Sequence, residues 1–358
     1  MLKKNLKIFG LIILIPVVLF AALIGVLTLT EYKPTEMTEA EIVTDQASHK
    51  PDKGDTLSLV TWNIGYGGLG ADSDFFMDGG HDTRSADRET VASYLDGQHA
   101  LLADVRPDIL MLQEIDADST RTYHLDERPA FAGFSSGSEA ADAAFAPNYK
   151  TLYVPYPLPP IGKVTSGLMT VSAFDTAENT RLALPCPFSW PIRLANLKRC
   201  LLVTRLPLED SDKELVVINL HLEAYDDGSG KIAQTKVLTS FLESEYQKGN
   251  YVIAGGDFNQ IFPDSAELYP NEHPDLWAVG ELNKADLPKG FAYAYDMSTP
   301  TCRLLNQPYD PSDAANTQHY VIDGFIISDN LDLDTVETLD EGFANSDHNP
   351  VRIEVTLR

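Results

Sequence analysis

Short apolar runs that end in polar residues recur along this chain. The clearest is Tyr251–Ala254, which ends in two glycines and is followed by Asp257 and Asn259. Its residues predict a buried strand with two oxygen-bearing side chains at its carboxyl end, and the glycines allow a sharp turn there. A carboxylate and an amide at alternate positions suit a hard cation or a phosphoryl oxygen. A strand leading into an Asx turn would give the same pattern.

Five other apolar runs carry polar or charged side chains at one end. They are Leu57–Thr61 before Asn63, Asp108–Leu112 before Glu114, Leu215–Ile218 before Asn219 and His221, Gly324–Ile327 after Asp323, and Val351–Ile353 after Asp347 and His348. Each run predicts a strand that places its polar group at a strand end.

Two stretches between these runs have helical periodicity. One begins at Ser85 and ends at Pro107, and Gly97 is expected to weaken or split it; the other is Gly230–Tyr246. Alternation of strands with few helices fits two packed sheets with helices outside them.

The amino-terminal segment has a different pattern. Ile8–Leu29 is an uncharged, mainly apolar run that as a helix would reach roughly 33 Å, enough to cross a bilayer. It exceeds the usual apolar region of a cleaved signal peptide, about 7–15 residues, so we expect an uncleaved anchor. The lysines of residues 1–7 predict a cytoplasmic amino terminus and an extracytoplasmic catalytic domain in a single-pass membrane protein. Residues 30–55 are polar and aperiodic and are interpreted as a linker to a domain at 56–358.

Charge and cysteine content narrow the classes of partner. The chain has 27 basic and 53 acidic residues, a net charge of −26, which disfavours tight non-specific binding of nucleic acid. A local basic cleft or a metal could still support a nuclease. Residues 179–199 contain the one basic stretch that could attract an anionic substrate, although ordinary surface charge is the alternative. Cys186 and Cys200 could pair outside the cell, or remain thiols.

The order of the six motifs resembles that of the endonuclease/exonuclease/phosphatase superfamily, over residues 56–358. The apolar run at 8–29 is expected to precede this domain as one transmembrane helix. The resemblance implies an α/β fold, a four-layered α/β sandwich of two packed mixed β-sheets flanked by helices. It also implies metal-dependent hydrolysis of a phosphoester by a chain that we expect to be monomeric.

The motif residues supply what such hydrolysis needs. Glu114, with Asn63 and Asp347, is the predicted metal site, to which Asp257 and Asn259 add oxygens; an all-oxygen set favours Mg²⁺ or Mn²⁺. His348 is the predicted general base, because its ordinary pKa suits proton transfer near neutral pH. Asp323 is the predicted partner that holds His348, and His221 is the predicted donor to the phosphoryl oxygen or the leaving group. Asn259 and Asn219 are predicted to orient the attacking water and the phosphate.

Substrate contacts are predicted less directly. Arg121 offers a planar fork of donors, and in the superfamily an Asn or Lys near Asn148 and Lys150 often contacts the phosphate. The loop at 65–82 is interpreted as an active-site lid or as a self-packed surface loop. A membrane anchor and an acidic surface favour a small or lipid-linked phosphoester. The alternatives are an extracellular nuclease acting on DNA or RNA, with a basic groove beside His348, and a non-catalytic binding module on the same fold.

Overall fold

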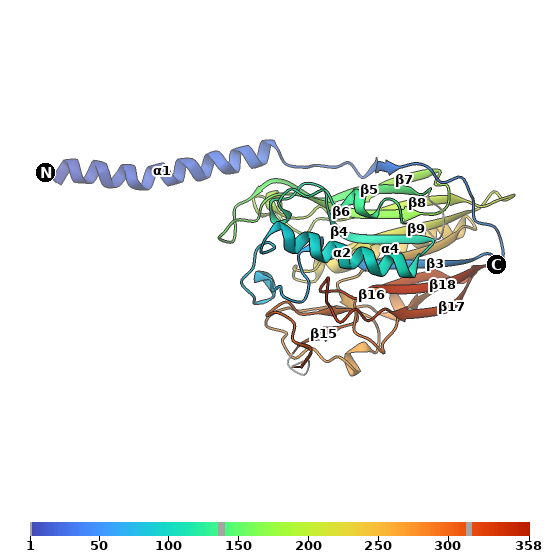
Figure 1. Ribbon diagram of the computed structural model, residues 1–358. Helices are drawn as coiled ribbons and strands as arrows, with labels where there is room; N and C mark the ends of the chain where they lie inside the picture. Colours follow the sequence, from blue (N-terminus) through green and yellow to red (C-terminus); the bar gives the residue numbers. More distant parts are fainter. Residues whose placement is uncertain (1, 135–139, 313–316) are drawn as a thin grey trace.

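The computed structural model describes residues 2–134, 140–312 and 317–358. Met1, the first residue of the predicted cytoplasmic segment, lies outside the described residues. Two seven-stranded sheets stack face to face, and a long helix, α1, extends away from them (Figure 1).

The first sheet is mixed, because β9 and β10 run parallel while the other neighbours run antiparallel. Its strands in spatial order are β1 (Met37–Glu39), β7 (Glu178–Ala183), β8 (Cys200–Pro207), β9 (Glu214–His221), β10 (Tyr251–Asp257), β16 (Asp323–Ser328) and β13 (Phe291–Ala294).

The second sheet is also mixed, with β3 and β4 as its parallel pair. Its strands in spatial order are β17 (Leu331–Thr338), β18 (Val351–Leu357), β3 (Thr56–Asn63), β4 (Ile109–Asp116), β6 (Gly162–Ser172), β5 (Asp142–Val154) and β2 (Glu41–Thr44). Two small sheets lie outside this framework: β11 (Gln260–Ile261) with β12 (Gly280–Glu281), and β14 (Cys302–Arg303) with β15 (His319–Tyr320).

Alternation along the central strands divides each sheet into two apolar faces. Leu57 and Leu59 of β3 point to the inner face, where they meet Leu215 and Val217 of β9 in one buried cluster. The intervening residues, such as Val60, point outward into a separate cluster. Burial on both faces explains why these strands read as continuous apolar runs in the sequence.

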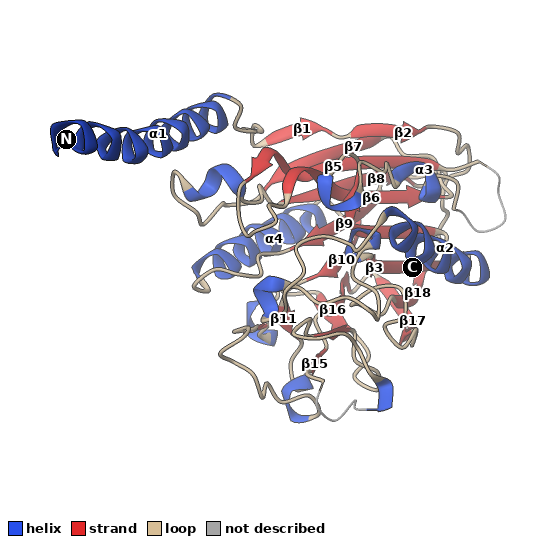
Figure 2. Ribbon diagram, turned by 60° about the vertical axis from the view of Figure 1, so that its left-hand side comes forward, coloured by secondary structure: helices blue, strands red, loops and turns tan. Residues whose placement is uncertain are grey.

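Helices cover the outer faces, which completes the predicted four layers (Figure 2). Helix α2 (Arg88–Val105) packs on the second sheet and α4 (Ser229–Gln247) on the first, while α3 is a single turn (Arg128–Phe131). The shortest helical segments are 3₁₀ turns: η1 (Gly65–Gly67), η2 (Phe76–Asp78), η3 (Thr120–Thr122), η4 (Ile192–Ala195), η5 (Ser265–Glu267) and η6 (Lys284–Asp286).

Helix α2 corrects two details of the sequence interpretation. The residue that caps it is Asp87 rather than Ser85, because the Asp87 carboxylate accepts from the Thr90 N–H at 2.8 Å. Gly97 does not split the helix. A Cβ at Gly97 would lie 2.2 Å from Oδ1 of Asn345, so the glycine allows the helix to approach the last motif closely.

The amino-terminal region contains more structure than a linker. Helix α1 (Leu2–Leu29) includes Ile8–Leu29, which alone among the helices of the described residues is long and apolar enough to cross a bilayer. Within residues 30–55, β1 and β2 each add an edge strand, one to each sheet. These strands are only three and four residues long, so their sequence carries no clear strand signal, and pairing with β7 and β5 forms them.

Glu245 of α4 illustrates how buried charge is held in this fold. Its carboxylate accepts from Arg205 at 2.8 Å, Lys248 at 2.8 Å and Asn250 at 3.0 Å. Burial opposes ionisation of Glu245, but these donors, Arg205 first, lower its pKa to about 2.

Replacing Glu245 with Gln is expected to lower the free energy of unfolding by about 1–3 kcal/mol at pH 7. Because the folded-state pKa lies below the ordinary value of 4.5, this contribution is fully present above that value and is lost as the pH falls towards 2. Urea unfolding in mild detergent should therefore separate wild type and variant more at pH 7 than at pH 3. An equal difference at both pH values would contradict this account.

Candidate active site

Side chains from both sheets meet in a cavity of about 360 Å³ at one end of the central strands. Asn63 ends β3 of the second sheet, while His221 and Asp257 end the adjacent strands β9 and β10 of the first, so both sheets deliver polar groups to the same end of the fold. The predicted site residues that line the cavity are Asn63, Glu114, Arg121, Asn148, His221, Asp257, Asn259, Asp347 and His348.

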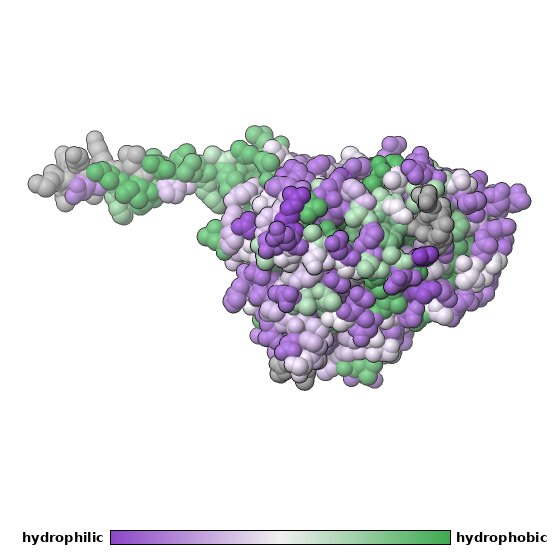
Figure 3. Space-filling view, in the orientation of Figure 1, coloured by the Kyte–Doolittle hydropathy of each residue, from purple (hydrophilic) through white to green (hydrophobic). Residues whose placement is uncertain are grey.

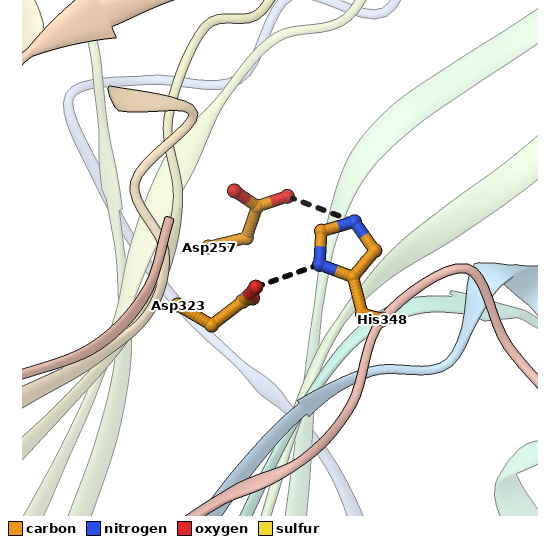
Figure 4. Close-up of side chains that lie close together, drawn as sticks. All are labelled: Asp257, Asp323 and His348. Atoms are coloured by element: carbon orange, nitrogen blue, oxygen red, sulfur yellow. Dashed lines mark hydrogen bonds and ion pairs between the residues drawn. The ribbon is translucent and has the colours of Figure 1, made fainter. Parts of the chain in front are cut away.

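His348 and Asp323 form a buried pair. Nδ1 of His348 lies 2.8 Å from Oδ2 of Asp323, while Nε2 faces Asp257 at 3.8 Å (Figure 4). The Asp323 backbone N–H donates to Oγ1 of Thr301, which fixes the start of β16. With Nδ1 held by the carboxylate, Nε2 is the ring nitrogen available to exchange a proton with a molecule in the cavity.

The last motif is tied to the first strand at several points. Oγ of Ser346 donates to the Asn63 carbonyl at 2.8 Å, and Nε1 of Trp62 donates to the His348 carbonyl at 2.8 Å. Gly65, with φ +54°, passes so close that a Cβ there would lie 2.8 Å from Oδ1 of Asp347. These contacts position Asp347 and His348 against the carboxyl end of β3.

Asp257 is the meeting point of the site. Its carboxylate accepts from Nδ2 of Asn63 at 3.1 Å and from the Asn259 N–H at 2.8 Å, and it lies 3.3 Å from Nε2 of His221. The register of the first sheet explains this position, because Asp257 pairs with His221 on one side and with Asp323 on the other.

Residues at the site adopt uncommon backbone conformations. Glu114, Asn259 and Tyr66 have φ values of +59°, +50° and +44°. Left-handed conformations of residues other than glycine cost free energy and concentrate at functional sites. Gly256, with φ +148°, admits the Leu220 carbonyl where a Cβ would lie 1.9 Å from its oxygen, which explains the second glycine of the motif.

The carboxylates at the site fit a divalent cation. The pKa of Asp257 is raised to about 7, mainly by burial and then by the negative charge of Asp323. The pKa of Asp347 is raised to about 6, mainly by burial, with the negative charge of Glu114 as a further cause. Among the described residues, the ion pairs of these two carboxylates are with histidines only. Buried carboxylate oxygens without a lysine or arginine ion pair among the described residues suit Mg²⁺ or Mn²⁺.

The placement of Asn63 refines the predicted metal site. Its Nδ2 donates to Glu114 at 3.4 Å and to Asp257, while its Oδ1 accepts from the Gly65 N–H at 3.1 Å. The amide therefore orients the carboxylates, while Glu114 and Asp347 line the cavity as oxygen donors that could hold a cation.

A second group of ligand types lies nearby. Asp257, Asp323 and His348 offer atoms within 4.8 Å of one another. Nδ1 of His348 and Oδ2 of Asp323 already bond to each other, so this group is better described as a hydrogen-bonded pair beside Asp257 than as a metal site.

The two histidines have opposite charge preferences. Burial opposes a charge on His348, but the Asp323 carboxylate outweighs it and raises the pKa of His348 well above its usual value. Burial lowers the pKa of His221 well below its usual value, and Arg199 and His348 lower it further. These effects favour the neutral form of His221, and its buried Nδ1 has no hydrogen-bond partner within the described residues.

Three nitrogen-bearing side chains line another part of the cavity. Arg121 forms a bidentate pair with Asp116, at 3.1 and 2.9 Å, and stacks over the Tyr66 ring at 3.6 Å. Nδ2 of Asn148 and Nε of Arg199 are buried without a hydrogen-bond partner among the described residues. The arrangement offers donors to the oxygens of an anion.

Two predicted substrate contacts lie outside the cavity. Lys150 is exposed on β5, with Nζ 5.6 Å from the centre of the Tyr32 ring. Asn219 is fully buried between the sheets, where Nδ2 donates to the Leu112 and Met169 carbonyls and Oδ1 accepts from Gln113. Its spacing of two from His221 puts it on the same face of β9, but one step further from the strand end.

Asn219 is therefore expected to affect stability rather than phosphate binding. Replacement by Leu leaves the Leu112 and Met169 carbonyls and the Gln113 amide short of partners, which should cost about 2–4 kcal/mol of unfolding free energy. Thermal unfolding checks this value, and the KM of the folded fraction should stay within about threefold of wild type. A large rise in KM without loss of stability would show that Asn219 contacts substrate after all.

Several cavity residues were not predicted from the sequence. Asp78 accepts from the Tyr225 hydroxyl at 2.8 Å, and Nη2 of Arg303 donates to the Gly70 and Ser73 carbonyls, which holds the loop at 65–82 in place. Glu223 lies 3.8 Å from Arg199. Asp78 and Arg303 come from a 3₁₀ turn and a two-residue strand, and Glu223 and Tyr225 come from an irregular segment. The nearest sequence signal was the position of Glu223 two residues after His221.

The basic stretch divides into different environments. Arg181 and Arg199 are buried, whereas Arg193 and Lys198 pair with Glu31 at 3.0 and 3.8 Å. Only Arg199 of these four lines the cavity. Each of the three cysteines is a free thiol, and Cys186 is the exposed one.

The fold and the cavity together define a two-sheet α/β protein with an acidic, histidine-containing site at the strand ends. A comparison with protein-family profiles matches residues 60–348 to the Endonuclease/Exonuclease/phosphatase family, and the chain belongs to that family. Members of this family hydrolyse phosphoester bonds, most of them with a divalent metal. A search of proteins with curated functions gave no significant match.

Solved structures share the fold at low sequence identity. An endonuclease/exonuclease/phosphatase family protein from Bacteroides thetaiotaomicron is 14% identical, with a TM-score of 0.52 over 86% of this chain and 99% of that one. A protein of the same description from Beutenbergia cavernae is 15% identical, with a TM-score of 0.52 over 84% and 72%. The catalytic domain of human Nocturnin, solved with a bound sulfate anion, is 16% identical, with a TM-score of 0.50 over 86% and 96%.

Proposed function

We propose that the protein is an Mg²⁺- or Mn²⁺-dependent phosphoester hydrolase. The observation that carries the proposal is the His348–Asp323 pair, which presents Nε2 of the imidazole to a cavity that also contains Glu114, Asp257 and Asp347. Family membership supplies the reaction class, and the site supplies a base, oxygen ligands and anion donors in one place.

Glu114 and Asp347 would hold the cation, with Asn63 orienting the carboxylates. When bound, the cation supplies positive charge that stabilises the phosphoryl oxygens. It also offsets the negative charge that now favours the protonated form of His348, so a loaded site leaves more of the imidazole free to act as a base.

His348 is the proposed general base. Nε2 takes a proton from water while the water oxygen forms a bond to phosphorus, and Asp323 stabilises the imidazolium that results. The phosphorus–oxygen bond to the leaving group then breaks, and the leaving oxygen takes up a proton. Asp257 and Asn259, joined by a hydrogen bond of 2.8 Å, lie beside this position and orient the water.

Donors on the other side of the cavity would stabilise the developing charge. His221, as a neutral imidazole, donates one N–H, and Arg121 and Asn148 are the predicted phosphate contacts that line the cavity. Arg199 joins them as a buried cation whose Nε has no hydrogen-bond partner among the described residues and lies 3.8 Å from Oε2 of Glu223. Buried donors of this kind interact strongly with an oxyanion because water is excluded.

We propose that α1 anchors the chain in a membrane and that the domain at 56–358 lies on the extracytoplasmic side. The apolar run of 22 residues and the lysines before it support this orientation. A membrane-impermeant maleimide should then label Cys186, the exposed thiol, in intact cells. Labelling only after lysis would place the domain inside.

One chain supplies every site residue, so we propose that the protein is a monomer. Light scattering in detergent would test this proposal.

The proposed substrate is a small or lipid-linked phosphoester. The net charge of −26 opposes a polyanion, and loops from several parts of the chain bound the cavity. Hydrolysis of DNA or RNA remains the alternative, because the family includes nucleases by name.

A substrate panel tests the proposal. The full chain in detergent would be assayed with bis(p-nitrophenyl) phosphate, an aryl monoester, a phospholipid mixture and supercoiled DNA, with Mg²⁺ or Mn²⁺ and with chelator. We expect chelator-sensitive turnover of the small or lipid esters. Chelator-sensitive nicking as the main activity would replace this proposal by the nuclease, and no turnover of any phosphoester would favour a non-catalytic module.

A further inference from the structure

The connection between β7 and β8 reaches both the cavity and the base of α1. Nε1 of Trp190 donates to Oγ1 of Thr28 in the last turn of α1, at 3.1 Å. Phe188, two residues before Trp190, lines the cavity, as do Leu197 and Arg199. One short segment therefore links the helix end to the active site.

Ion pairs fix this segment to the helix end. Glu31, two residues after α1, lies 3.0 Å from Arg193 and 3.8 Å from Lys198, and its side chain is almost fully buried. Leu27 of α1 is buried against the domain as well. The connection and the end of α1 are thus held together by polar and apolar contacts.

The last part of β5, which leads into the connection to β6, lies alongside this segment. Oγ1 of Thr151 donates to the Leu194 carbonyl at 3.1 Å, and the Tyr149 hydroxyl donates to the Ala195 carbonyl at 2.9 Å. Residues 155–161 continue from this contact, and Ile161 at their end lines the cavity. In Figure 1 this part of the chain is green, and the green loops lie on the side of the domain from which α1 extends.

These two connections expose large apolar side chains. Trp190 is 53% exposed and Ile192 60%, while Tyr156 is 71% and Leu158 85% exposed. We name these four residues the apolar rim. Figure 3 shows a mainly hydrophilic domain surface, with hydrophobic residues along α1 and at the domain edge on the same side.

The chemistry of the apolar rim matches one partner. Tryptophan and tyrosine concentrate where a bilayer meets water. An apolar side chain beside a membrane helix no longer exposes apolar surface to water when lipid covers it. Two cationic side chains, Lys33 and Arg193, are partly exposed next to the rim in an otherwise acidic chain. Such cations attract anionic headgroups.

The cavity wall has both charged and apolar parts. Charged groups gather at the strand ends, around Asp257 and His348, while Phe75, Met77 and Phe188 line other parts of the wall. A ligand with a phosphoester head and an apolar remainder fits this division.

We propose that the apolar rim lies in the interface of the bilayer that α1 enters, and that the cavity takes its phosphoester from a lipid of that bilayer. This inference rests on the proposed function and adds the surface and the substrate class. The reaction is the same hydrolysis: water bonds to phosphorus, the ester bond to the leaving group breaks, and the leaving oxygen gains a proton.

Fluorescence quenching tests the placement of the rim. The chain contains three tryptophans, of which Trp62 and Trp277 are buried. The full chain in nanodiscs with brominated acyl chains should lose a substantial part of its emission, and Trp190→Phe should lose that quenchable part. Emission that brominated lipid leaves unchanged, or quenching that persists in Trp190→Phe, would overturn the placement.

A comparison of two substrates tests the role of the apolar rim in hydrolysis. The triple variant Leu158→Ser, Trp190→Ser, Ile192→Ser should hydrolyse a phospholipid in the nanodisc at least tenfold more slowly than wild type. Hydrolysis of soluble bis(p-nitrophenyl) phosphate should stay within twofold, since none of the three residues lines the cavity. Leu268→Ser, which changes an exposed leucine outside the rim, is the matched control and should leave both rates unchanged.

The outcomes separate this inference from the proposed function. If wild type hydrolyses the soluble diester but the triple variant keeps its rate on the bilayer, the interface is wrong and the hydrolase stands. If wild type hydrolyses neither substrate, the proposed function fails, and this inference fails with it.

Discussion

His348→Ala is expected to lower kcat/KM for a phosphodiester by about 10³-fold, within the range of a positioned general base. Nε2 faces the cavity and Nδ1 is held by Asp323 at 2.8 Å, so Nε2 is the nitrogen of His348 that can take a proton from water. Steady-state rates at saturating Mg²⁺ measure the effect. Metal affinity should change little, because the proposed metal ligands are Glu114 and Asp347.

Two further variants sharpen this prediction. Asp323→Asn should also lower the rate, and the double variant should be no slower than about the His348→Ala single variant, since residues that act as a unit are not additive. His124→Ala is the matched control, because His124 is exposed and paired with Asp118; its rate should equal that of wild type. Additive losses in the double variant would contradict a joint role.

Glu114→Gln is the second large effect. Glu114 is a carboxylate of β4 that faces the cavity and accepts a hydrogen bond from Asn63. Loss of its charge should raise the Mg²⁺ concentration for half-maximal rate by at least about tenfold, and should lower the rate at limiting metal by about 10²-fold.

Direct binding of Mn²⁺, followed by electron paramagnetic resonance, checks the metal site without relying on turnover. We expect weaker binding by Glu114→Gln and unchanged binding by Glu209→Gln, which alters an exposed carboxylate elsewhere. Unchanged Mn²⁺ affinity in Glu114→Gln would place the cation away from β4.

The strand ends could be predicted because burial on both faces produces continuous apolar runs. Residues 251–257 form β10 as predicted, whereas the pairing of Asp257 with Asp323 across the sheet depends on a strand order that the sequence did not predict. Sequence periodicity does not show, however, how far along a strand a residue lies from the cavity. Asn219 and His221 share a face, yet only His221 reaches the cavity.

Residues outside the regular elements could not be placed in the same way. Arg199 and Tyr225 reach the cavity from irregular segments or strand starts, where no period specifies direction. The low helix propensity of Gly97 predicts a weak point in the helix, but close approach to Asn345 decides the role of this glycine. Similarly, β1 and β2 form by pairing at sheet edges, which local sequence does not reveal.

Hydrolysis in ¹⁸O-labelled water tests the central claim most directly. The metal-stripped full chain would be mixed with bis(p-nitrophenyl) phosphate, and Mg²⁺ would then be added. The account predicts no turnover before the metal and, after it, a p-nitrophenyl phosphate product that carries one ¹⁸O, because water attacks phosphorus. Turnover without metal, or a product free of label, would contradict it.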